Sequence, residues 1–129
     1  MPFVASQVLS DADASQGPMD VRDADAFRRD VLEAREPTMV LFWATWCPFC
    51  RRVKPEFDRL ALDLRIRAAT VYLDDESNPL WDDYDVQVVP TIALFRGGEL
   101  VDRENGVLGY GLDRRAVREF SNRVAPLLS

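Results

Sequence analysis

The sequence predicts an α/β fold in which helices flank both faces of a central mixed β-sheet. Two observations lead to this prediction. Apolar runs of strand length alternate with amphipathic helical segments along most of the chain. A two-residue turn, Gly97-Gly98, joins the last two expected strands as a hairpin. Strands joined through a helix pair in parallel and hairpin strands pair antiparallel, so the expected sheet is mixed.

The length of 129 residues corresponds to one domain. Residues 1–17 contain few large apolar side chains and lead into a chain-breaking Gly-Pro pair. We therefore expect a flexible N-terminal tail over residues 1–17 and a single domain over residues 18–129. Within the domain, Asp23 is the expected N-cap of a first helix that Pro37 stops.

The first strong strand signal is the continuous apolar run over residues 38–43, which is typical of a central strand buried on both faces. A long amphipathic helix is expected after this strand. Its apolar residues recur in steps of three and four, at Cys50, Val53, Phe57, Leu60 and Leu64. Pro55 lies inside the helix and removes one backbone hydrogen bond, so we expect a kink there.

The remaining elements follow the same alternation of strands and helices. We expect a second central strand at residues 70–74, a short helix from Asn78-Pro79 to Tyr84, a third strand at residues 91–95, its hairpin partner at residues 99–103, and a final amphipathic helix after the N-cap Asp113.

Composition excludes several kinds of chemistry. The chain has two cysteines and no histidine, which rules out Ser-His and Cys-His catalysis and histidine-ligated zinc. Its formal charge of -6 argues against nucleic-acid or anionic membrane partners. No apolar stretch is long enough to span a membrane and the N-terminus lacks signal-peptide features, so we expect a cytoplasmic protein. There, a closely spaced cysteine pair is more often catalytic or metal-binding than structural.

The segment Cys47-Pro48-Phe49-Cys50 stands where the buried strand gives way to the long helix. Helical positions three apart bring two cysteines close enough to form a disulfide with little backbone movement. Unpaired N–H groups and the positive dipole end at a helix start favour the thiolate of Cys47. Pro48 suits a first helical turn, and Phe49 adds an apolar rim.

These positions assign roles to the two thiols. Cys47 precedes the helix and should be accessible, whereas Cys50 begins the apolar stripe and should be partly buried. We therefore expect Cys47 to attack a partner's disulfide and Cys50 to resolve the mixed disulfide. Position alone leaves two other interpretations open, a bridged metal or iron–sulfur role and no chemical role at all.

Several segments resemble the thioredoxin family. Residues 42–50, Phe-Trp-Ala-Thr-Trp-Cys-Pro-Phe-Cys, resemble the thioredoxin active-site segment, and Pro55 matches the proline of the helix that follows it. Residues 89–91 and 95–99 resemble the cis-proline strand and its hairpin. The resemblance runs from about Pro18 to the C-terminus, which makes this part of the chain a thioredoxin-like domain.

The resemblance implies a thioredoxin fold and an enzyme that reduces protein disulfides, a thiol-disulfide oxidoreductase with no bound cofactor beyond its redox-active cysteine pair. Its implied partners are disulfide-containing proteins and a thioredoxin reductase as electron donor, and its implied state is a monomer. By position, Trp46 would flank the nucleophile and contact substrate, and Pro90 would be a cis-proline beside the disulfide. The backbone of Val89 would pair with an extended substrate segment, and Gly109 would line the same groove. Trp43 would pack in the core.

Two features depart from the family's pattern. The usual Cys-Gly-Pro-Cys is Cys-Pro-Phe-Cys here, which is nearer the glutaredoxin Cys-Pro-Tyr-Cys. Thioredoxins also keep a buried Asp on the strand before the motif and a Lys on the next strand, and these positions align with Leu41 and Val71. We therefore expect water or a carboxylate elsewhere to deprotonate Cys50, and reduction to be slower than in a typical thioredoxin.

Other functions stay open at this point. Pro48-Phe49 favours a glutaredoxin-like activity, and an oxidase or isomerase would use the same cysteines. Cys47 from two chains could hold an iron–sulfur cluster, or the edge at Val89-Pro90 could bind peptides without catalysis. The acidic run Asp74-Asp75-Glu76 is expected to serve capping and solvation rather than metal binding.

Overall fold

The structure, a computed structural model, describes residues 17–128. Apart from Gly17, the tail expected over residues 1–17 lies outside the described residues. Five strands form one mixed sheet in the order β1-β3-β2-β4-β5. These strands are β1 (Met19–Val21), β2 (Thr38–Trp43), β3 (Arg67–Tyr72), β4 (Thr91–Arg96) and β5 (Glu99–Asn105). β1 and β2 pair in parallel with β3, whereas β4 pairs antiparallel with β2 and β5, which confirms the mixed sheet.

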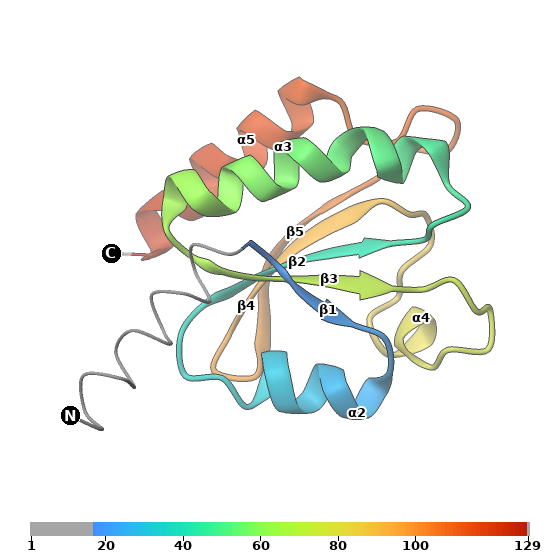
Figure 1. Cartoon of the computed structure of the whole chain (residues 1–129). Coiled ribbons are helices and arrows are strands. Elements are labelled where there is room, and N and C mark those ends of the chain that lie inside the picture. Colours follow the sequence, from blue (N-terminus) through green and yellow to red (C-terminus); the bar gives the residue numbers. More distant parts are fainter. Residues whose placement is uncertain (1–16, 129) are drawn as a thin grey trace.

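Helices cover both faces of the sheet, as predicted (Figure 1). α3 (Pro48–Leu64) and α5 (Arg114–Val124) lie over one face, and a 3-10 turn (Ala125–Leu128) follows α5. The other face is covered by α2 (Ala24–Phe27), which continues as a π-helical segment (Arg28–Leu32), and by α4 (Leu80–Asp83).

Each face of the sheet has its own apolar cluster. The cluster beneath α3 and α5 includes Phe57 and Phe120 from those helices and Leu41 from β2. The cluster on the opposite face includes Phe27 and Val71, together with both cysteines. The domain thus buries apolar side chains in two layers, which is the reason that β2 is apolar at nearly every position.

Local sequence determines where the helices begin. The side chain of Asp23 accepts a hydrogen bond from the backbone N–H of Ala26 at 2.8 Å, and Asp113 accepts one from Ala116 at the same distance. Both expected N-caps are confirmed. Pro55 lies inside α3, as predicted.

Element boundaries differ from the prediction in four places. β1 was missed, because only three residues form it and only Val21 is buried. β3 covers residues 67–72 rather than 70–74, since the alanines at its start give a weak strand signal. The first helix ends at Leu32, before Pro37, and β5 continues two residues beyond Arg103. Within residues 17–128, no helix is both long enough and apolar enough to cross a bilayer.

Candidate active site

Cys47 lies at the N-cap of α3, immediately after the turn that follows β2. Its backbone is extended, with φ -98° and ψ 113°, and its Sγ accepts a hydrogen bond from the backbone N–H of Cys50 at 3.3 Å. Pro48 occupies the start of the helix, as predicted, and both thiols are free. The N–H bond and the positive end of the helix dipole stabilise negative charge on the Cys47 sulfur.

The two sulfurs are more enclosed than the sequence predicts. Cys50 is completely buried, and Cys47 is only 5% exposed, although it was expected to be accessible. The reason is that the Cys47 side chain turns inward, where its thiol donates a hydrogen bond to the backbone carbonyl of Val89 at 3.7 Å. The cysteines approach each other to 2.8 Å, so they form one reactive unit.

Burial also determines the protonation state of the second thiol. It raises the pKa of Cys50 strongly above its ordinary value, and the hydrogen bond with Cys47 raises this pKa further. Cys50 therefore keeps its proton at neutral pH until the sulfur of Cys47 has reacted. A step that needs the Cys50 thiolate must include the loss of this proton.

The residues at the two positions where the family has Asp and Lys do not lie together. Leu41 is fully buried in the cluster beneath α3, whereas Val71 packs in the cluster on the opposite face. The neighbour of Leu41 in the β2–β3 register is Thr70, whose buried hydroxyl has no hydrogen-bond partner. The placement of Val71 beside Leu41 is therefore wrong by one residue, because adjacent strand positions face opposite ways.

Val89 and Pro90 form the strand-side wall of the site. The peptide bond between them is cis, as the resemblance implied, and both residues are buried. Gly106 packs directly on this wall, since a Cβ at that position would lie only 2.3 Å from the carbonyl oxygen of Pro90. A Cβ at Gly109 would meet nothing within 4 Å. The structure thus brings Gly106, which sequence reasoning missed, against Pro90 and leaves Gly109 in the turn beyond it.

The turn before Cys47 is held by an acidic residue from another loop. Trp46 is 56% exposed, and its indole Nε1 donates a hydrogen bond to the carbonyl oxygen of Asp74 at 3.1 Å. The carboxylate of Asp74 accepts a bond from the Thr45 backbone N–H at 2.9 Å and another from its hydroxyl. Sequence reasoning assigned Asp74 only capping and solvation, because no local pattern indicates a contact across 29 residues.

Two further predicted residues take the following places. Phe49 is half-buried, and the guanidinium of Arg52 lies 5.7 Å from its ring centroid. Trp43 is half-buried and packs against both apolar clusters, and its Nε1 is buried without a hydrogen-bond partner.

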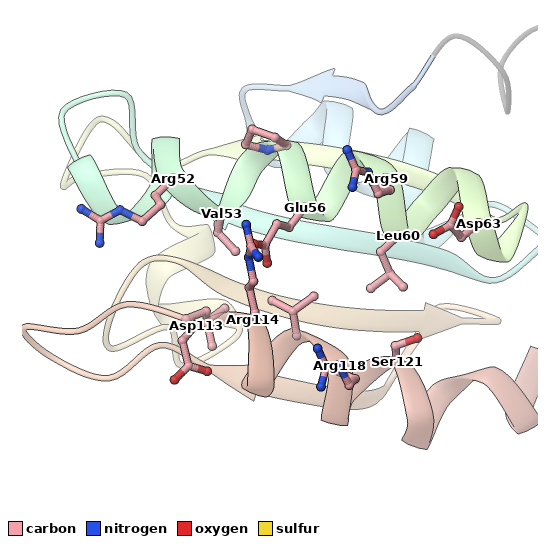
Figure 2. Close-up of a pocket in the computed structure, with 13 residues that line it drawn as sticks. Arg52, Val53, Glu56, Arg59, Leu60, Asp63, Asp113, Arg114, Arg118 and Ser121 are labelled. Atoms are coloured by element: carbon pink, nitrogen blue, oxygen red, sulfur yellow. The ribbon is translucent and has the colours of Figure 1, made fainter.

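A cavity of about 780 Å³ lies elsewhere, between α3 and α5. Figure 2 shows its lining, with Arg52, Glu56 and Arg59 from α3 and Arg114 and Arg118 from α5. Glu56 accepts a hydrogen bond from Arg114 across this cavity at 2.9 Å. Neither cysteine lines it, so the reactive thiols lie outside this cavity. In the described part of the chain, no three metal-binding side chains come together.

The comparisons with known proteins agree with this geometry. The family model described as Thioredoxin matches residues 19–114. The chain belongs to the thioredoxin family. It is 36% identical over 105 residues to the bifunctional thioredoxin reductase/thioredoxin of Mycobacterium leprae, a match that covers 81% of this chain and 23% of that protein. It is also 36% identical over 89 residues to a thioredoxin of Synechocystis sp., which covers 68% of this chain and 82% of that protein.

Solved thioredoxins have the same fold. A mutant thioredoxin from Halobacterium salinarum NRC-1 superposes with a TM-score of 0.64 at 25% identity, covering 87% of this chain and 88% of that one. Thioredoxin f2 of Chlamydomonas reinhardtii gives a TM-score of 0.70 at 23% identity, covering 85% and 98%. This thioredoxin-family protein is a thiol-disulfide oxidoreductase, and the comparisons do not favour the glutaredoxin-like, cluster-binding or non-catalytic interpretations.

Proposed function

We propose that this protein reduces disulfides in partner proteins, with Cys47 as nucleophile and Cys50 as resolving thiol. The observation that carries the proposal is the position of the Cys47 sulfur, at the N-cap of α3 and 3.3 Å from the backbone nitrogen of Cys50. Cys47 is the more exposed of the two cysteines, so a partner's disulfide reaches it first. No cofactor beyond the two cysteines is needed for this exchange.

The reaction proceeds in two exchange steps. The Cys47 thiolate attacks one sulfur of the partner's disulfide, which forms a mixed disulfide and releases the other partner sulfur as a thiolate. Cys50 then loses its proton to water and attacks the Cys47 sulfur, which forms the Cys47–Cys50 disulfide and releases the second partner thiolate. The partner gains two electrons, and the cysteine pair loses two.

The surrounding residues support a protein substrate. Trp46, Phe49, Val89 and Pro90 surround the reacting sulfur, and Gly106, which has no side chain, lies against Pro90. The backbone of Val89 is placed to pair with an extended substrate segment, in the manner of an added β-strand. We assign Gly106 to this surface in addition to the Gly109 predicted from the sequence.

A thioredoxin reductase is the electron donor in this proposal. Support comes from the Mycobacterium leprae relative, whose name joins a thioredoxin reductase and a thioredoxin in one protein. We further propose that the protein works in the cytoplasm as a monomer, where such a donor keeps the cysteine pair reduced.

The proposal is tested with NADPH, a bacterial thioredoxin reductase and insulin as the disulfide substrate. The wild type should support NADPH oxidation, Cys47→Ser should have no activity, and Cys50→Ser should accumulate the mixed disulfide detectable by mass spectrometry. The reduction potential of the cysteine pair should lie near the thioredoxin value of about -270 mV. A value near the DsbA potential of about -120 mV would replace the reductase by an oxidase or isomerase.

A further inference from the structure

Residues 106–111, Gly-Val-Leu-Gly-Tyr-Gly, form a turn between β5 and α5 that is called the 106–111 turn below. Three of its side chains are large, apolar and exposed: Val107 at 57%, Leu108 at 82% and Tyr110 at 78%. Apolar side chains that gather on the surface of one short segment are typical of contact surfaces, because their exposure to water is unfavourable.

Backbone hydrogen bonds give this turn a defined shape. The N–H of Val107 donates to the carbonyl oxygen of Gly111 at 2.9 Å, and the N–H of Gly111 donates back to the carbonyl of Val107 at 2.8 Å. The N–H of Tyr110 also donates to the Val107 carbonyl, at 2.9 Å. The exposed side chains are therefore presented from a closed turn, which lowers the entropy cost of binding.

Both ends of the turn pack on the redox site. At one end, Gly106 is pressed against the carbonyl oxygen of Pro90. At the other end, a Cβ on Gly111 would lie 2.6 Å from the Cβ of Phe49, inside the Cys-Pro-Phe-Cys segment. The turn thus borders the reactive cysteines, and its apolar side chains extend the rim that Trp46 forms.

A substrate must touch this rim. The sulfur of Cys47 lies in a residue that is only 5% exposed, so a partner's disulfide has to be brought down between the surrounding side chains. Neighbouring residues of an extended segment lie about 3.3 Å further along the chain. The residues next to the partner's cysteine are the ones that reach the 106–111 turn.

We propose that the 106–111 turn makes this protein selective for disulfides flanked by a large aliphatic or aromatic residue. Leu108 and Tyr110 are the specificity-determining residues, since they are the most exposed of its apolar side chains and tyrosine is enriched where binding energy concentrates. The proposal rests on the proposed function only in that Cys47 must be the nucleophile.

The test uses the Cys50→Ser variant of the full chain, which stops at the mixed disulfide. Two peptide disulfides that differ only in the residue next to the cysteine, Phe or Ser, compete for Cys47, and mass spectrometry measures the ratio of the two adducts. The same competition is run with Leu108→Ser and Tyr110→Ser added together. Leu62→Ser is the matched control, because Leu62 is 48% exposed on α3 outside the site.

The Phe adduct should exceed the Ser adduct by about tenfold in the parent and in the Leu62→Ser control. The ratio should fall to about one when Leu108 and Tyr110 are both replaced. Trapping with a ratio near one in the parent, or a tenfold ratio that survives both replacements, would overturn the selectivity while leaving Cys47 as nucleophile. Absence of any adduct would overturn the proposed function together with the selectivity.

Discussion

The indole nitrogen of Trp46 donates a hydrogen bond to the backbone carbonyl of Asp74, and the Asp74 carboxylate binds the residue before that tryptophan. One residue of the loop after β3 thus fastens the turn that leads from β2 into α3. The guanidinium of Arg51 holds the same turn from the helix side, through the Thr45 carbonyl at 3.2 Å. The orientation of Trp46 beside Cys47 depends on this pair of attachments.

Asp74→Ala should slow disulfide reduction severalfold, because Thr45 loses both hydrogen bonds and Trp46 loses its fixed orientation. The free energy of unfolding should fall by only about 1 kcal/mol, since these bonds are exposed to solvent. Insulin reduction and urea unfolding measure the two effects. Asp75→Ala is the matched control, because the Asp75 carboxylate bonds only Ser77. Equal rates in the two variants would show that Asp74 has no part in positioning the site.

The stability of the reduced protein should decrease in alkaline solution. Burial raises the pKa of Cys50 in the folded state, whereas the thiol of the unfolded chain ionises near pH 8.5. Above that pH the unfolded state releases a proton that the folded state keeps, so the free energy of unfolding falls by about 2 kcal/mol between pH 8 and 10. Urea unfolding of the reduced protein measures this fall. The Cys50→Ser variant should lack it, and a variant with the same slope would attribute the effect to another group.

Leu41→Asp should increase the rate of insulin reduction near neutral pH. The new carboxylate would stand on β2, in the cluster that α3 covers, and would accept the proton that Cys50 must lose. We expect an increase of roughly tenfold, below the usual range for a positioned base, together with a loss of about 3 kcal/mol of stability from burying the carboxyl group. Leu41→Asn is the control, because an amide cannot accept this proton. An equal rate in both variants would contradict a limiting deprotonation.

Gly106→Ala should reduce activity by more than about tenfold and destabilise the fold by about 2 kcal/mol, since its Cβ would meet the Pro90 carbonyl. Gly109→Ala should have a much smaller effect on activity. Its Cβ has no neighbours within 4 Å, and its φ of +83° costs about 1 kcal/mol for a residue with a side chain. Steady-state insulin reduction with thermal unfolding compares the two. The reverse order of effects would assign the groove to Gly109.

Periodicity predicted the elements with long, consistent patterns. α3 followed from apolar residues that recur over more than four helical turns, and β2 followed from six consecutive residues suited to a buried strand. β1 has only three residues, which is too short for any period to be visible. The shift of β3 has a larger consequence, because an error of one residue exchanges Thr70 for Val71 and moves the side chain to the other face.

Within the site, the parts that are local in sequence were predictable. The N-cap position of Cys47, the start of the helix at Pro48 and the exposure of Trp46 depend on neighbouring residues. The contact between Thr45 and Asp74 joins two loops, and no residue pattern in either loop indicates the other. The segment 106–111 contains three glycines, and only the folded chain shows which of them meets Pro90.

The sulfur of Cys47 contacts Val89, which is made 42 residues later during synthesis, and Gly106 is made later still. A growing chain therefore exposes two bare thiols long before the walls around them exist. Until the last strand is in place, these thiols have no rim to select a partner and are open to any oxidant. Selective exchange with a peptide disulfide is accordingly a measure of completed folding for this protein, and one that detects a misplaced C-terminal third more directly than a loss of helix content.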